Sequence, residues 1–461
     1  MFFISYKESF DYLCYFFYNI LRTVIFMNKE LLKQKICNVI DENKDKICKI
    51  GQFIFEHPEL GYKEFITSEL VQKTFDELNL SYEKDLGVTG VKAKLNDKED
   101  EMNVAIVAEL DAVMCPAHPY ADSKTGAAHC CGHFAQITSM LAAAIGLNAV
   151  KDEIDYGNVT FLAVPAEECV EIEYRQQLIK EGKISYLGGK QEFLHLGLMN
   201  DIDMAMLVHG MNDSSIIKAT SNGVGFIAKT VKFIGKEAHA GIVPWEGVNA
   251  LDAASLALMA INSVRSTLKG EDCIKIHPIL TKGGTLVNII PNEVRMEMYI
   301  RGATIEAIKD ANFKVNRAVK GCAYAIGCDV EIIDMPGYLP LNSDLNLGKV
   351  FEENANFISP ETRNYCATEI EGISSDIGDL STMVPVIGAG CGGFINGFHS
   401  KDFEISDENL TYIVPAKILA CTIIDLLDNQ GEKAKYIKEN FKSTYSMNEY
   451  DNIWKEILKQ D

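Results

Sequence analysis

The sequence predicts an α/β protein with a mixed β-sheet covered by helices, into which a smaller α+β domain is inserted. Apolar runs at residues 102–113 and 158–168 alternate with helical segments, which is typical of strands in the middle of a sheet. From residue 221 the strands instead alternate apolar and polar residues, and the α/β pattern returns after residue 334. With 461 residues, the chain is long enough for two such domains.

Residues 27–220 are predicted to form the first part of the larger domain. Charged and apolar residues alternate at helical spacing between residues 28 and 80, which predicts two helices separated by a turn at Pro58 and Gly61. The remaining elements are expected in this order: strands at 88–95 and 102–113, a helix at about 133–148, and strands at 158–168 and 203–210.

Residues 221–334 are predicted to form the inserted domain, with the β-α-β-β-α-β order of a ferredoxin-like arrangement. Its expected elements are a strand at 224–235, a helix near 247–268, a strand pair through 286–302, a helix near 304–327 and a strand at 329–334. Residues 335–430 return to the larger domain with a strand at 384–390 and a helix near 407–428. The tail, residues 431–461, is predicted to be a solvated helix.

Composition and charge exclude several classes of protein. The formal net charge of −21 argues against a nucleic-acid partner, which would require a Lys/Arg footprint. In the apolar N-terminal extension, residues 1–26, the longest uncharged run is 12–21, shorter than the ~20 residues of a membrane span, and we expect it to have no catalytic role. Thirteen scattered cysteines indicate reduced thiols in a cytoplasmic protein.

Polar side chains gather where the predicted strands end. Because ligands bind at the carboxyl ends of strands in an open α/β sheet, these side chains are candidates for a shared site. Besides Asp111, they include one thiol, three imidazoles and two carboxylates, a mixture that suits a borderline-soft divalent ion such as zinc. The candidates are Asp111, Cys131, His133, Glu167, Glu168, His209 and His399.

Glu167 and Glu168 are adjacent at the end of a strand, where neighbouring side chains point to opposite sides. One can therefore bind metal while the other faces a metal-bound water as a general base, because metal lowers the pKa of that water to ~7. Taken singly, each histidine could be structural, the glutamate pair could be surface charge, and Cys130 and Cys131 could be core thiols. Their conjunction at strand ends favours a site.

Several motifs in this order and spacing carry a resemblance to a known family: residues 57–69 (HPELGYKEFITSE), 108–113 (AELDAV), 129–133 (HCCGH), 164–168 (VPAEE), 236–251 (KEAHAGIVPWEGVNAL), 286–297 (LVNIIPNEVRME) and 374–381 (SSDIGDLS). Over about residues 28–428 the chain resembles the aminoacylase-type amidohydrolases of metallopeptidase family 20. Within that family it is most similar to the branch of p-aminobenzoyl-glutamate hydrolase and the auxin-conjugate amidohydrolases.

The resemblance implies a zinc-exopeptidase-like catalytic domain and an inserted domain that serves as lid and dimerisation domain. It also implies a homodimer and two divalent metal ions, zinc or manganese. By position, the family's metal ligands match Cys131 in the bridging place, together with His133, Glu168, His209 and His399. Its general base matches Glu167.

Three residues of the inserted domain match one catalytic and two substrate-binding positions of the family. His239 matches a histidine that reaches the neighbouring subunit's active site and stabilises the tetrahedral oxyanion. Asn288 and Arg301 match residues that hold the substrate carboxylate, and the planar fork of arginine suits that role. Read without the resemblance, these residues would be a loop histidine, a turn residue and a surface cation.

The loop around the predicted ligands contains one departure from the family. The family has Asp or Asn after the CGH motif, whereas this chain has Phe134, so we expect altered metal affinity or metal choice. Of the neighbouring residues, we expect Asp111 to orient a ligand rather than bind metal, His129 to support the loop, and Cys130 to pack in the core.

The predicted function is a metal-dependent amidohydrolase that cleaves an N-acyl or aryl-amide bond next to an amino-acid carboxylate. Substrates of this kind include aminobenzoyl-glutamate-like compounds and N-acyl amino acids. The alternatives are a dipeptidase and a catalytically silent metal- or ligand-binding protein, the latter supported by Phe134 alone. A cysteine hydrolase using Cys130 or Cys131 with His133 would leave the other predicted ligands unexplained.

Overall fold

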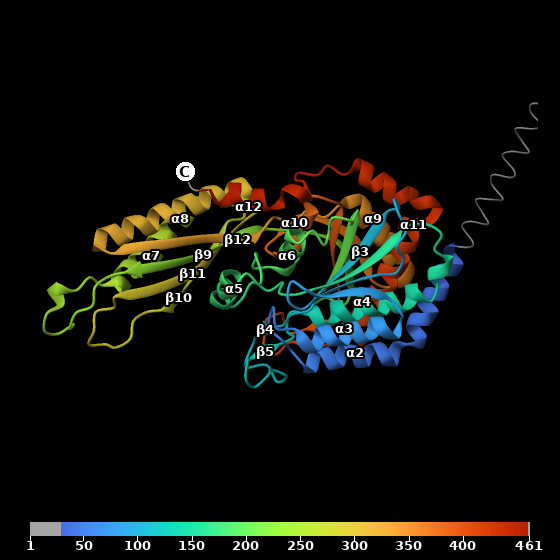
Figure 1. Ribbon diagram of the computed structural model, residues 1–461, viewed down its shortest axis with the longest axis horizontal. Helices are drawn as coiled ribbons and strands as arrows, with labels where there is room; N and C mark the ends of the chain where they lie inside the picture. The colour runs from blue at the N-terminus through green and yellow to red at the C-terminus, as the bar shows by residue number, and fades with distance from the viewer. Residues whose placement is uncertain (1–28, 460–461) are drawn as a thin grey trace, which may run out of the picture.

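The computed structural model describes residues 29–459 and has two parts that lie side by side, each built on its own sheet (Figure 1). We call residues 29–223 and 339–459 the main part, and residues 225–338 the lid. The chain leaves the main part once, after residue 223, and returns after residue 338. The N-terminal extension, residues 1–26, lies outside the described residues.

The main part is built on a mixed sheet of eight strands. Four central strands, β6, β3, β7 and β14, run parallel to one another, so their carboxyl ends meet at one edge of the sheet. Across the sheet the order is β1 (Ser81–Leu86), β2 (Gly90–Lys94), β6 (Asn158–Val164), β3 (Asn103–Glu109), β7 (Met204–Gly210), β14 (Val386–Cys391), β8 (Ile216–Gly223) and β13 (Arg363–Glu371).

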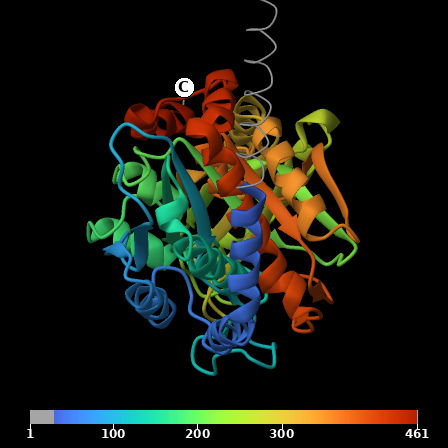
Figure 2. The ribbon, with the colours of Figure 1, turned by 90° about the vertical axis from the view of Figure 1, so that its right-hand side faces the viewer.

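Helices cover both faces of this sheet, as the view along the molecule shows (Figure 2). Residues 29–42 are also helical, so the first predicted helix is divided at Asn43. One face carries α2 (Lys44–Glu56), α3 (Phe65–Glu77), α4 (His133–Asn148), α9 (Leu345–Ile358) and α11 (Val414–Asn440). The other carries α6 (Gly189–His195), α10 (Ile377–Ser381) and α12 (Tyr450–Leu458), while α5 (Ile172–Lys180) lies toward the lid.

Helix α4 and the first part of α11 are largely apolar because they are enclosed by protein. In α4 every residue from His133 to Leu147 is buried, since the helix packs between the sheet and the helices α2 and α11. The helical segment Asn409–Asn440, which includes α11, is long and apolar enough to cross a membrane, but 94% of its most apolar part is buried inside the protein. It is therefore a core helix.

The lid has the predicted β-α-β-β-α-β order, and its antiparallel strands lie in the order β10-β11-β9-β12 of a ferredoxin-like sheet. Residues 286–290, which the sequence pattern placed in a strand, instead form a loop whose Leu286 and Val287 are exposed to solvent. The elements are β9 (Gly225–Ile234), α7 (Ala250–Arg265), β10 (Lys275–Lys282), β11 (Glu293–Gly302), α8 (Ile305–Ile326) and β12 (Asp329–Tyr338).

The C-terminal segment is not the predicted solvated tail. After a backbone break at residues 428–431, the chain continues to α12, which packs on α6, α8 and β12 and so touches both parts (Figure 1). Trp454 is 2% exposed, and its Nε1 and the Tyr450 hydroxyl donate to Asp379 Oδ1 at 3.1 and 2.7 Å. The apolar spacing of Tyr450, Ile453, Trp454 and Ile457 was a sequence signal for an amphipathic helix.

We expect Trp454→Ala to destabilise the protein by about 3–5 kcal/mol, because it leaves a cavity where α12 joins the lid to the main part. Thermal unfolding measures the loss as a lower Tm. Asn452→Ala on the exposed side of the same helix is the matched control and should leave Tm unchanged. Equal Tm values for the two variants would contradict the packing described for α12.

Candidate metal centre

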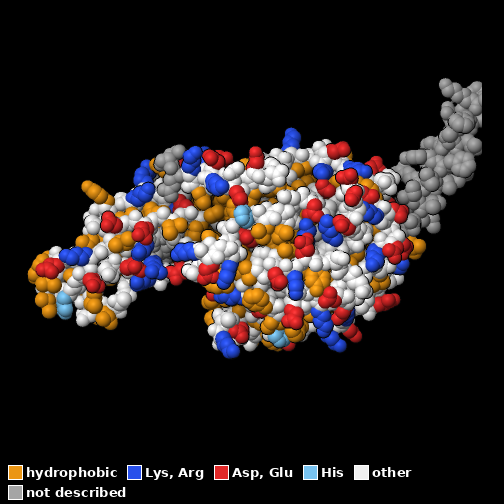
Figure 3. Space-filling view, in the orientation of Figure 1, with side chains coloured by type: hydrophobic (Ala, Val, Ile, Leu, Met, Phe, Trp, Pro, Cys, Tyr) orange, Lys and Arg blue, Asp and Glu red, His pale blue; other side chains and the backbone are white. Residues whose placement is uncertain are grey.

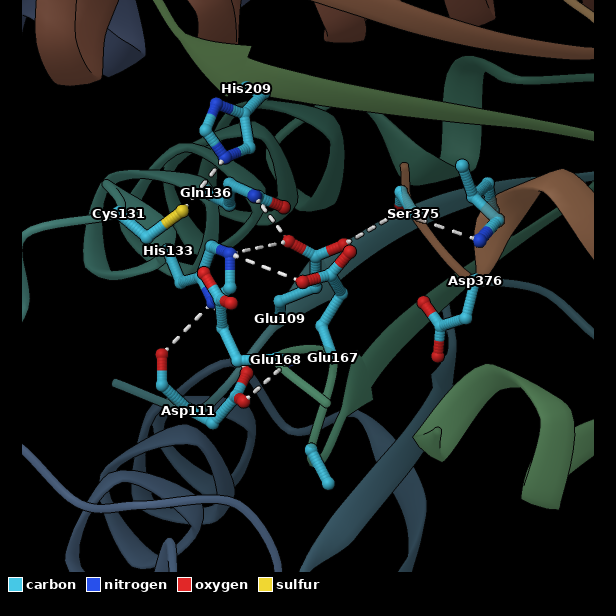
Figure 4. A network of polar contacts seen from close by, with 12 residues as sticks. Glu109, Asp111, Cys131, His133, Gln136, Glu167, Glu168, His209, Ser375 and Asp376 are labelled. Carbon is cyan, nitrogen blue, oxygen red and sulfur yellow. Dashed lines mark hydrogen bonds and ion pairs between the residues drawn. The ribbon is translucent and has the colours of Figure 1, made fainter. Parts of the chain in front are cut away.

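The predicted metal ligands converge at the carboxyl edge of the large sheet. Figure 4 shows four of them, Cys131, His133, Glu168 and His209. Glu167 and Glu168 lie on the loop after β6, separated by two residues from its end at Val164, His209 lies near the end of β7, and His399 lies on the loop after β14. Cys131 and His133 flank Gly132, whose φ of 90° is a conformation that glycine adopts without strain. This turn starts α4 and places both side chains at the same edge.

The ligating atoms form two groups that have Cys131 in common. Cys131, His133 and His209 offer atoms within 4.8 Å of one another, and so do Cys131, Glu168 and His399. Cys131 Sγ lies 3.5 Å from His209 Nε2, and His399 Nε2 lies 2.9 Å from Glu168 Oε1. Two groups that share one thiol can hold two divalent ions on either side of it.

The hydrogen bonding of His133 fits a metal ligand. Its Nδ1 lies 2.9 and 3.1 Å from the carbonyl oxygen and Oδ1 of Asp111, which fixes the ring and directs Nε2 into the cluster. This buried Nε2 faces carboxylate groups, and Glu109 Oε2 lies 3.0 Å from it. Asp111 also accepts from Glu168 N at 2.9 Å, so it contacts two predicted ligands.

Charges inside the cluster shift its pKa values in opposite directions. Burial opposes ionisation of Glu168, but the hydrogen bond and charge of His399 lower the pKa of this carboxyl to about 2. Burial raises the pKa of Glu167 well above its usual range, and the carboxylates of Glu109 and Glu168 raise it further. Two adjacent glutamates thus occupy different electrostatic environments, which suits two different roles.

A buried network beside the cluster was missed by sequence reasoning. Glu109 Oε2 lies 3.0 Å from His133 Nε2, and its Oε1 pairs with Lys190 Nζ at 2.5 Å. Lys190 is fully buried and also pairs with Asp376. Burial opposes ionisation of Glu109, but Lys190 and His133 lower its pKa to about 2. Glu109 also forms a third possible metal-binding group with His133 and Glu167.

Glu109 had a detectable sequence signal, because a charged residue that ends an apolar strand is unusual. Lys190 had none, since lysines on short helices are common at the surface.

A cavity of about 570 Å³ opens beside the cluster, between the main part and the lid. Cys131, Glu167, Glu168, His209 and His399 line it, together with residues 371–375 and Arg301 of strand β11. Arg301 Nη1 donates to Ser374 Oγ at 2.8 Å. The predicted carboxylate-binding arginine therefore faces the same cavity as the predicted ligands.

His239 and Asn288 are not brought to this cavity, since neither is among the described residues that line it. They lie together on two exposed loops of the lid, where Ala240 N donates to the carbonyl oxygen of Asn288 at 2.9 Å and His239 forms an isolated bridge with Ile289. Within one chain the predicted site therefore lacks two of its predicted members.

Phe134 is a fully buried core residue whose ring lies 4.9 Å from Phe55 and 5.7 Å from His129 between centroids. In the described part of the chain, neither ring nitrogen of the buried His129 makes a hydrogen bond. Burial, with the nearby His133, lowers the pKa of His129 to about 3, so this ring is neutral. Cys130 is also fully buried. An influence of Phe134 on metal binding stays a prediction.

A helix-covered α/β sheet with an inserted lid, and Cys, His and Glu side chains clustered at the strand ends, define a hydrolase of the metallopeptidase type. Residues 105–421 match peptidase family M20/M25/M40. The chain belongs to this family, which confirms the predicted fold class and an enzyme of the peptidase and amidohydrolase type.

Individual relatives have different activities. The Xaa-Arg dipeptidase of Homo sapiens is 27% identical over 442 residues, covering 90% of this chain and 92% of that protein. The hippurate hydrolase of Campylobacter jejuni is 27% identical over 62% of this chain and 71% of its own. A dinuclear metal-binding M20 peptidase of Bacillus subtilis has a similar fold, with a TM-score of 0.61 at 21% identity over 83% of this chain and 98% of that one. The substrate, and the predicted branch within the family, therefore stay open.

Proposed function

We propose that this protein is a metal-dependent amidohydrolase that releases an amino acid from an N-acyl or aryl-amide conjugate. Two divalent ions, zinc or manganese, would be held by Cys131, His133, Glu168, His209 and His399. The observation that carries this proposal is that two potential ligand groups share Cys131, while Glu167, which belongs to neither of them, lines the adjoining cavity.

The roles of the residues follow from this arrangement. Bound metal ions would supply polarisation of the scissile carbonyl and a lowered pKa of the attacking water. Glu167 accepts the proton of that water and delivers it to the leaving amine. Asp111 holds the His133 ring through Nδ1. Arg301 binds the carboxylate of the amino acid through its planar fork.

The remaining members of the site would come from a second copy of the chain. His239 and Asn288 are exposed on the lid, away from the cavity of their own chain. Hydrophobic side chains gather at the free end of the lid (Figure 3), and Ile242, Trp245 and Val287 are among the exposed ones. A cytoplasmic homodimer would bury these side chains and bring His239 to the partner's oxyanion.

A dipeptidase is the second candidate, favoured by the 27% identity to a protein named Xaa-Arg dipeptidase. It would use the same metal centre and the same general base, so only the group on the amino side of the scissile bond differs.

The test is a hydrolysis screen of N-acyl amino acids, aryl-glutamates and dipeptides, with zinc and manganese added separately. We expect about two metal ions per chain and hydrolysis of at least one of these classes. Removal of the metal with a chelator should abolish turnover, and re-addition should restore it. A chain that binds no metal and cleaves none of the three classes would instead be a silent binding protein.

A further inference from the structure

The cavity beside the metal centre contains an ion pair that the proposed reaction does not use. Lys218 Nζ on β8 donates to both carboxylate oxygens of Glu371 at the end of β13, at 2.8 and 2.7 Å. The Lys218 side chain is 8% exposed and that of Glu371 is 40% exposed, and both residues line the cavity. The group of the pair that faces the cavity is therefore the carboxylate.

The strand register places this pair close to the metal centre. His209 on β7 is opposite Gly390 on β14, which in turn is opposite Lys218 on β8. Residues in register point to the same face of a sheet, and neighbouring strands are ~4.8 Å apart, so Lys218 lies about 10 Å from His209. Gly390 has no side chain, and the adaptable thioether of Met211 packs over it. The side chain of one amino acid can span the distance between the metal centre at His209 and the ion pair at Lys218.

The same cavity wall carries the residue proposed to bind the substrate carboxylate. Arg301 donates to Ser374, three residues after Glu371, and three residues span at most about 10 Å. Lys275, in register with Arg301 on the neighbouring strand, ends near Gly372 and adds a second cation on the lid side. The wall thus offers cations from the lid and an anion, Glu371, from the main part.

We propose that Glu371, oriented by Lys218, is a specificity-determining residue that binds the cationic end of a basic amino-acid side chain in the substrate. The α-carboxylate of the same amino acid would lie on Arg301. Each oxygen of Glu371 accepts one hydrogen bond from Lys218 and retains a lone pair for an ammonium or guanidinium group. This inference rests on the proposed function and names its substrate class: conjugates or dipeptides of arginine, lysine or a similar basic amino acid.

The test begins with binding, so that it does not depend on turnover. L-arginine and L-citrulline, which have the same shape but differ in charge, are titrated calorimetrically into the full-length, metal-loaded protein. We expect arginine to bind about 10- to 100-fold more tightly, the range of a charge-assisted hydrogen bond. Glu371→Gln should remove this difference and, by exposing the Lys218 ammonium, favour L-glutamate. Glu369→Gln, on the exposed part of the same strand, is the matched control and should keep the wild-type preference.

Equal affinity of the wild-type protein for arginine and citrulline would overturn the proposal, and this comparison needs no variant to fold. Turnover of N-benzoyl-arginine and N-benzoyl-citrulline then separates the two hypotheses. If both compounds are hydrolysed with the same kcat/KM, the amidohydrolase stands and the subsite fails. If arginine binds in a manner dependent on Glu371 but no acyl-amino acid or dipeptide is cleaved, the subsite stands and the proposed function fails.

Discussion

Glu167→Gln is expected to lower kcat by about 10²- to 10⁴-fold while the protein retains about two metal ions per chain. Glu167 lines the cavity and belongs to neither group that shares Cys131, so its loss as a base should not release metal. Glutamine has nearly the same shape but cannot accept the proton of the attacking water. Substrate binding should therefore change little, and the effect should appear in kcat rather than in KM.

The adjacent carboxylate provides the matched comparison. Glu168 is within 4.8 Å of both Cys131 and His399, so Glu168→Gln should lower the metal content as well as the rate. Metal analysis and steady-state kinetics of the two variants distinguish the roles. Normal turnover of the Glu167→Gln variant would contradict the proposed mechanism. Loss of metal from that variant would instead assign Glu167 to the third group, with Glu109 and His133.

The sequence predicted those helices and strands whose local pattern of apolar and polar residues reflects their burial in the fold. The strand that ends at Glu109 is apolar from Val104 to Ala108 because it is buried inside the sheet, and the helix at His133–Asn148 was predicted at the bounds that the structure has. The change at residue 221 from uninterrupted to alternating strands marked the chain's passage from one sheet to the other, because the central strands β3 and β6 of the first sheet are fully buried, whereas β11 of the second sheet alternates buried and partly exposed residues. These features could be predicted because they depend on residues that are close together in the sequence.

The parts that the sequence did not predict depend on contacts between distant residues. Lys190 reaches Glu109 across 81 positions, and Lys218 reaches Glu371 across 153. Trp454 contacts Asp379, 75 positions away. No local pattern separates a lysine that ends in such a pair from one in solvent, because burial is decided by the packing of whole elements. The predicted ligands could be proposed because they lie at the ends of strands or on the loops that follow them, and the fold brings strand ends together.

The lid histidine is expected to act across a dimer, and a mixture of two inactive variants should reveal it. His239→Ala alone should lower kcat by about 10²- to 10³-fold, the effect of losing one oxyanion-stabilising donor. Because His239 is exposed on the lid and does not line the cavity of its own chain, its effect should fall on the partner's site. Metal content should remain unchanged, since no predicted ligand is altered.

Co-expression of Glu167→Gln and His239→Ala chains decides between a shared and a separate site. In a shared arrangement, each heterodimer has one site with both wild-type residues and one with neither. Random assembly gives about half heterodimers, so activity should return to about one quarter of the wild-type value. If each chain used its own His239, the mixture would show only the residual activity of its components. Recovery therefore requires both a dimer and a lid that reaches into its partner.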